Sequence, residues 1–108
     1  MVTDRVATEE GMQVPDYELV LVISPELTEE ESEATIDSVT RFITGKGGII
    51  SDIERWGKRR LAYPIRHFVE GSYVLARFTL QPASHKELEA NLRISEEVLR
   101  HLLIKLDR

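Results

Sequence analysis

The chain of 108 residues contains no cysteine. This absence excludes disulfides, cysteine-ligated iron–sulfur clusters and thiolate zinc sites, and it is typical of a protein from a reducing compartment. Long apolar runs are also missing, because no stretch approaches the roughly 20 apolar residues that span a bilayer. The first residues lack the apolar core of a signal peptide. We therefore expect a cytoplasmic protein that is neither membrane-bound nor secreted.

Residue patterns typical of catalytic or metal sites are scarce as well. The three histidines are His67, His85 and His101. They form no i, i+4 pair and show no metal-ligand spacing. Gly45, Gly47 and Gly48 follow a predicted helix instead of opening one, so they do not form a phosphate-binding loop. The sequence therefore predicts no cofactor, no metal, no small-molecule substrate and no enzymatic activity.

What the chain does contain is the composition of one folded domain. Hydrophobic residues make up 42% and charged residues 31% of the sequence, which is ordinary for a globular protein and far from the composition of chains that stay unfolded. Residues 1–15 show no sustained hydrophobic period, and we predict a flexible N-terminal extension there. Residues 16–108 then form a single domain.

The domain begins with a strand and a capped helix. Residues 17–23 carry apolar side chains on both faces, which indicates a central strand. Thr28 and Glu31 have the spacing of a capping box, in which side chain and backbone hydrogen-bond reciprocally at a helix start. The helix is predicted to continue to about Thr44.

Two further strands follow this helix. Residues 49–63 are predicted as a long strand whose far end lies at a sheet edge, because Pro64 cannot donate a ladder hydrogen bond. A turn over residues 66–71 leads to a third strand over residues 72–80. This strand is apolar enough to be central.

A second helix and a last strand complete the domain. Ser84 and Glu87 have the spacing of a second capping box, for a short helix to about Arg93, and residues 98–106 form the fourth strand. The order β, α, β, β, α, β predicts an α+β fold, the ferredoxin-like sandwich of a four-stranded antiparallel sheet with two helices on one face. Right-handed crossovers place the first and third strands in the middle.

The face of this sheet without helices carries apolar side chains from the central strands. On the predicted alternation it includes Val20, Val22, Tyr73, Leu75 and Arg77. A solvent-facing apolar patch is typical of a docking surface, so we predict that these residues contact a protein partner. The alternative is that the N-terminal extension or loops cover some of them.

Concentrated positive charge is the clearest functional signal in the sequence. The chain has a formal net charge of −5, yet one short run is rich in cations and includes the single tryptophan. The residues concerned are Arg55, Trp56, Lys58, Arg59, Arg60 and Arg66. Such a basic patch predicts an anionic partner. Because side chains alternate along a strand, Lys58 and Arg60 point to one side and Arg59 to the other, unless the strand twists or bulges.

The segment from Trp56 to Ile65, WGKRRLAYPI, closely resembles the signature of the bacterial ribosomal protein S6 family, in which a glycine and basic residues precede Leu-Ala-Tyr-Pro-Ile. The resemblance extends to Tyr17 and Glu18 at the first strand and to residues 92–94 after the second helix. It covers about residues 16–107 in the same element order.

This resemblance implies a structural, RNA-binding role in the platform of the small (30S) ribosomal subunit. Proteins of the family bind 16S rRNA of the central domain together with ribosomal protein S18, with which they form a heterodimer, and they catalyse no reaction. The implied RNA-binding candidates are Arg55, Trp56, Lys58, Arg59, Arg60, Arg66 and Arg93. The candidates for the protein partner are Leu61, Tyr63 and Ile65 together with the five residues of the open sheet face.

Some of these candidates have a purely structural alternative. Trp56 and Tyr63 either stack on unpaired bases or pack against the protein. Arg93 either contacts RNA or complements the C-terminal carbonyls of the second helix. The acidic residues at the start of the first helix are interpreted as a solvated face turned away from RNA; they are Glu26, Glu29, Glu30, Glu31 and Glu33.

Other protein classes share the predicted fold. A regulatory module that pairs edge to edge and binds metabolites would also use an exposed edge strand and an apolar face. An RNA-recognition motif is disfavoured, because residues 70–78 lack the ordered basic, glycine and aromatic residues of its third strand. An acylphosphatase is disfavoured because residues 24–26 are Ser, Pro and Glu where that family carries a glycine-rich loop and an arginine.

Overall fold

The computed structural model describes residues 14–106, which form four strands and two helices. In chain order these are β1 (Asp16–Ile23), α1 (Glu29–Gly45), β2 (Ile49–Ile65), β3 (Phe68–Thr79), α2 (Pro82–Ile94) and β4 (Val98–Leu106). The predicted N-terminal extension over residues 1–15 lies outside the described residues, apart from Val14 and Pro15. Neither helix of the described part is long and apolar enough to cross a membrane.

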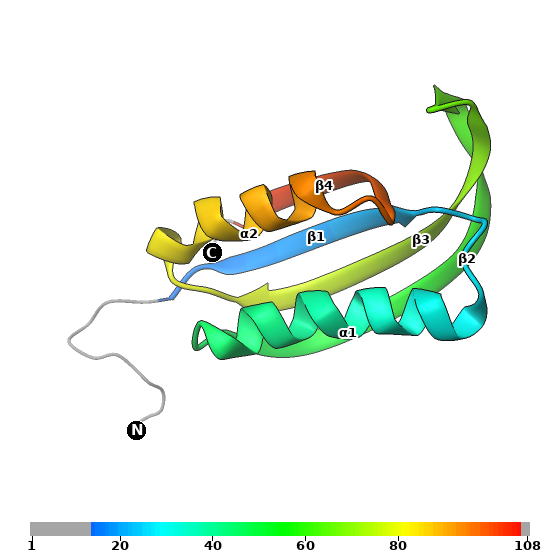
Figure 1. The fold of residues 1–108 in the computed structure, drawn as a ribbon. Helices are drawn as coiled ribbons and strands as arrows, with labels where there is room; N and C mark the ends of the chain where they lie inside the picture. Colours follow the sequence, from blue (N-terminus) through cyan, green and yellow to red (C-terminus); the bar gives the residue numbers. More distant parts are fainter. Residues whose placement is uncertain (1–13, 107–108) are drawn as a thin grey trace.

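The four strands form one antiparallel sheet with the order β2-β3-β1-β4. Strands β1 and β3 therefore lie in the middle, as the predicted crossovers require. Both helices pack on the same face of the sheet, which leaves the opposite face without helices (Figure 1). The prediction of a ferredoxin-like α+β sandwich is confirmed.

The hydrophobic core lies between the sheet and the two helices. Alternate side chains of β1 and β3 point into it and meet the buried faces of α1 and α2, in accordance with the two-residue period of strands. The largest side chains that are almost fully buried are Tyr17, Leu19, Leu21, Ile23, Ile43, Phe78, Leu80, Leu88 and Leu92. Burial of this set stabilises the fold by removing apolar surface from water.

Helix α1 begins at the predicted capping box. The Thr28 hydroxyl accepts a hydrogen bond of 3.1 Å from the Glu31 amide, and the Thr28 amide donates one of 2.9 Å to the Glu31 carboxylate. These two bonds satisfy amide groups that have no partner within the helix.

The start of α2 differs from the prediction. The helix begins at Pro82 with Gln81 as its N-cap, and the Gln81 side chain makes no capping hydrogen bond. The predicted Ser84–Glu87 capping box is therefore wrong, because both residues already lie inside the helix. Proline at the first helical position has the right φ and needs no hydrogen-bond partner for its nitrogen, so the helix starts earlier.

The turn between β2 and β3 is also shorter than predicted. It consists of Arg66 and His67 alone, with φ angles of 49° and 64°, and Ile65 pairs directly with Phe68. Two central residues with positive φ are what a type I′ hairpin turn requires. Gly71 belongs to β3, where a Cβ atom would lie 2.4 Å from the Val22 side chain. The glycine at this position permits close packing on β1 and does not mark a turn.

Beyond the end of β1, strands β2 and β3 continue as a two-stranded extension, here called the hairpin arm (residues 58–71) (Figure 1). Two irregularities interrupt the pairing of β2 with β3 in this region, one between Arg55 and Gly57 and one between Arg60 and Ile65. Bulges of this kind bend and twist a strand. They direct the hairpin arm away from the plane of the sheet.

Candidate nucleic-acid and protein interface

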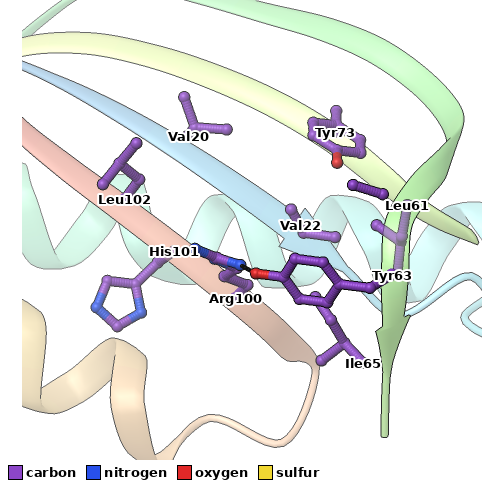
Figure 2. Close-up of a pocket in the computed structure, with 10 residues that line it drawn as sticks. Val20, Val22, Leu61, Tyr63, Ile65, Tyr73, Arg100, His101 and Leu102 are labelled. Carbon is purple, nitrogen blue, oxygen red and sulfur yellow. Dashed lines mark hydrogen bonds between the residues drawn. The ribbon is translucent and has the colours of Figure 1, made fainter. Parts of the chain in front are cut away.

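The hairpin arm and the open face of the sheet enclose an apolar pocket (Figure 2). The pocket has a volume of 230 Å³ and is lined by Val20, Val22, Leu61, Ala62, Tyr63, Ile65, Tyr73, Arg100, His101 and Leu102. All four strands contribute to it. Six of the eight residues predicted to contact a protein partner lie together here, and Leu75 and Arg77 do not.

The second irregularity of β2 produces this arrangement. Residues 61–64 have no partners in the β3 ladder, although Arg60 pairs with Glu70 and Ile65 with Phe68. Pro64 cannot donate a ladder hydrogen bond, which suits an unpaired stretch at a sheet edge. The backbone therefore bends, and Leu61 and Tyr63 lie over the open face (Figure 2).

The hairpin arm is connected to the opposite edge of the sheet. The Tyr63 hydroxyl accepts a hydrogen bond from the Arg100 guanidinium, whose Cζ atom also lies 5.8 Å from the centre of the Tyr63 ring (Figure 2). Arg66, in the turn, donates a hydrogen bond of 3.3 Å to the Glu96 carbonyl just before β4. The arm thus reaches from edge strand β2 to edge strand β4 at two points.

Trp56 lies at the first irregularity and packs on the open face. Its ring is nearly parallel to that of Tyr73, and its Nε1 donates a hydrogen bond of 3.0 Å to the Glu54 carboxylate. The Arg59 guanidinium lies above the indole, 5.7 Å from the ring centre. Trp56 is still 41% exposed, so packing by Trp56 and contact with a ligand are compatible.

A cluster of ionised groups lies next to Trp56. The Arg77 guanidinium is 3.0 Å from the Glu18 carboxylate, 3.1 Å from that of Asp52 and 3.3 Å from that of Glu54. The hydrogen bond from Trp56, followed by the interactions with Arg77, holds the pKa of Glu54 below its usual range. The bond to Glu18 raises the pKa of Arg77. Arg77, predicted to contact a partner, is therefore surrounded by carboxylates of its own chain.

The predicted RNA-binding cations have different surroundings. The Arg55 guanidinium lies 3.3 Å from the carboxylate of Glu33 and 3.8 Å from that of Glu29, so it contacts two of the acidic residues of α1. Within residues 14–106, Lys58 and Arg60 are exposed and form no ion pair. Arg93 is exposed in the last turn of α2, on the helical layer.

Two residues of the open face were predicted to face solvent but are buried in the structure. Val22 and Leu75 are each only 5% exposed. Val22 is covered because the hairpin arm bends over this end of β1, which the linear alternation of β1 does not reveal.

The prediction also omitted the contribution of β4. Leu102 pairs with Val20 and Arg100 with Val22 across the β1–β4 ladder, and paired residues point to the same face of a sheet. The sequence carried a signal for this contribution, because Arg100, Leu102 and Ile104 alternate along β4 and therefore lie on one face of it.

The fold is that of a small ferredoxin-like domain, in which the hairpin arm combines exposed cations with an apolar pocket. A family model described as ribosomal protein S6 matches residues 16–105. The small ribosomal subunit protein bS6 of Moorella thermoacetica is 42% identical over 92 residues, which cover 85% of this chain and 94% of that protein. The bS6 of Caldanaerobacter subterraneus subsp. tengcongensis is 45% identical over 91 residues, covering 84% and 96%.

A solved structure agrees with these sequence matches. The crystal structure of 30S ribosomal protein S6 from Thermotoga maritima superposes with a TM-score of 0.83 at 32% identity, covering 87% of this chain and 89% of that chain. The chain belongs to the ribosomal protein S6 family.

Proposed function

We propose that the protein is a structural component of the small (30S) ribosomal subunit in the cytoplasm and acts by binding, without catalysing a reaction. In this role it binds central-domain 16S rRNA through the hairpin arm and ribosomal protein S18 through the open sheet face. The observation that carries the proposal is the presence of exposed cations on the same arm that covers an apolar pocket. One element then serves two kinds of partner.

The cations of the arm have the chemistry that RNA binding requires. Lysine and arginine neutralise phosphates and release counterions, and guanidinium groups form two parallel hydrogen bonds to a phosphate. Arg60 and Lys58 carry no carboxylate partner within the described residues. Arg59 lies above the exposed Trp56 ring, and an arginine beside an aromatic surface is a common way to hold unpaired bases.

The salt dependence of binding tests the RNA part of the proposal. The double substitution Arg59→Glu with Arg60→Glu should weaken binding to central-domain 16S rRNA. It should also reduce the slope of log affinity against log salt by about 0.7–0.9 for each phosphate that the arm no longer neutralises. The control is Arg41→Glu with Lys86→Glu, which makes the same change in net charge on the two helices. Equal affinity and slope for both variants would exclude the arm as the RNA site.

Sedimentation tests the subunit assignment itself. The tagged full chain should travel with small subunits in a sucrose gradient at moderate salt. A chain that stays at the top of the gradient and forms a stable homodimer, with thermal stabilisation by amino acids or nucleotides, would instead be a metabolite-binding module.

A further inference from the structure

The pocket beneath the hairpin arm has the size to receive one side chain. Its volume of 230 Å³ is below the roughly 300–1,000 Å³ of pockets that bury drug-sized ligands. Val20 and Val22 of β1 form its floor, and Leu61 and Ile65 of the arm lie opposite (Figure 2). An apolar hollow of this size suits a single large apolar side chain better than a metabolite.

A cation lies at the rim of this hollow. Arg100 is exposed, and its side-chain contacts within residues 14–106 are with the hydroxyl and the ring of Tyr63, which are neutral. A partner that covered Arg100 would remove a guanidinium from water, and a buried charge without a counter-charge is strongly unfavourable. A partner that buries Arg100 is therefore expected to place a carboxylate against it.

The rim of the pocket also consists of residue types that contribute strongly to binding at protein interfaces. Tyr63 is 56% exposed beside Arg100, and Leu102 on β4 is 54% exposed. Tyrosine and arginine are enriched among the residues that dominate binding energy at protein interfaces. The Tyr63–Arg100 hydrogen bond holds both side chains in place before a partner arrives, which reduces the entropy lost on binding.

We propose that the pocket binds a segment of a partner protein that inserts one large apolar side chain beneath the hairpin arm and places an Asp or Glu carboxylate on Arg100. The inference rests on the proposed function, because it takes S18 as the protein that carries this segment. An RNA phosphate would satisfy Arg100 but would leave the apolar floor formed by Val20 and Val22 uncovered. A protein segment satisfies both features.

The binding test measures the affinity of the full chain for purified S18 by calorimetry. Arg100→Glu should weaken binding by about 30-fold or more, the range expected when one member of a buried charge pair is removed. Lys105→Glu is the matched control, because it makes the same charge change at an exposed position of β4 whose side chain alternates to the other side. It should change the affinity by less than about 3-fold, as expected for a rim charge.

A second variant tests the pocket independently of charge. Val20→Phe places a larger side chain in the open hollow, on a strand where aromatic residues are favourable. It should retain the thermal midpoint of the parent and weaken S18 binding to a similar extent. Replacing the acidic residues of S18 by lysine, one at a time, should identify one substitution that restores binding to the Arg100→Glu chain.

The outcomes separate this inference from the proposed function. Equal S18 affinity for Arg100→Glu and Lys105→Glu, full binding by Val20→Phe, or no rescue by any S18 substitution would overturn it. So would a homodimer that Val20→Phe converts to a monomer, or a loss of binding to protein-free 16S rRNA caused by Arg100→Glu. A chain that joins small subunits and binds S18, with an affinity that neither Arg100→Glu nor Val20→Phe changes, would overturn the inference alone. A chain that neither joins small subunits nor binds S18 would overturn the proposed function.

Discussion

The indole ring of Trp56 lies nearly parallel to the phenol ring of Tyr73, with ring centres 6.4 Å apart and an interplanar angle of 11°. The stack joins edge strand β2 to central strand β3 at the base of the hairpin arm. It lies at the point where the arm departs from the sheet.

This stack predicts a difference between two substitutions of Trp56. Trp56→Ala should lower the free energy of unfolding by at least the roughly 0.5–1.5 kcal/mol that an aromatic pair contributes, whereas Trp56→Phe should retain much of it. Urea denaturation followed by circular dichroism measures the stability of both variants, because each substitution removes the single tryptophan and with it the usual fluorescence signal. Ile94→Ala, at a position that is 80% exposed, is the control and should change stability by less than about 0.5 kcal/mol. Equal effects of the two Trp56 substitutions would contradict a contribution from stacking.

Glu54 predicts a pH dependence of stability. Its pKa is lowered in the folded state by the hydrogen bond from Trp56 and by Arg77, so the carboxylate stabilises the fold above its unfolded pKa. This contribution disappears as pH falls through the folded pKa. Glu54→Gln keeps an oxygen for Trp56 but does not titrate. Between about pH 6 and pH 3 the variant should therefore lose less stability than the parent in urea titrations.

The control for Glu54 separates this local effect from net charge. Glu70→Gln removes the same charge from the hairpin arm, outside the cluster around Arg77. If Glu70→Gln changed the acid response as much as Glu54→Gln, the hydrogen bond from Trp56 would not be the cause.

The capping box predicts a loss of stability for Thr28→Ala. Removal of the hydroxyl leaves the Glu31 amide without its partner, and substitutions of this kind lower stability by about 0.5–2 kcal/mol. Thr28→Ser retains the hydroxyl and should stay close to the parent in the same chemical denaturation experiment. A Ser variant as unstable as the Ala variant would show that the methyl group of Thr28, and not its oxygen, matters.

Two glycines, Gly45 as the last residue of α1 and Gly48 just before β2, predict opposite results. At Gly48 a Cβ atom would lie 2.5 Å from the Thr79 carbonyl oxygen and 2.9 Å from that of Ile43, whereas at Gly45 no atom lies within 4 Å. Gly48→Ala should therefore be destabilising by about 1–3 kcal/mol, as in other overpacked sites. Gly45→Ala should be neutral or stabilising, because alanine favours helix. Thermal unfolding of the two variants makes the comparison directly.

The sequence predicted the order of elements because each carries a local signal. The alternation of residues 17–23 and the Thr28–Glu31 spacing depend on neighbours in the chain, and both are present in the structure. The Ser84–Glu87 spacing was an equally local signal, but Pro82 starts the helix before it is reached. Pro82 and the Ser84–Glu87 spacing are competing local signals for the start of α2, and the spacing alone does not show which of them sets it.

The candidate pocket was predictable only in part. Strand alternation brought Val20, Val22 and Tyr73 to one face, and the motif supplied Leu61, Tyr63 and Ile65. The bend of residues 61–64 brings Tyr63 into contact with Arg100, which is 37 residues away in the chain. A contact between distant residues leaves no periodic pattern in the sequence, so the closure of the arm over the open face was not predictable. The alternation along β4, in contrast, was a signal that could have placed Arg100 and Leu102 on that face.

The tip of the hairpin arm shows where this chain departs from the most stable sequence for its backbone. Arg66 and His67 both adopt positive φ, a conformation that asparagine and glycine adopt with less strain. Replacing the pair by Asn-Gly would stabilise the turn and also delete the guanidinium that reaches the Glu96 carbonyl. Selection for thermal stability alone would therefore remove from the tip a side chain that we propose to bind RNA, so variants of this turn have to be compared for stability and for RNA binding separately.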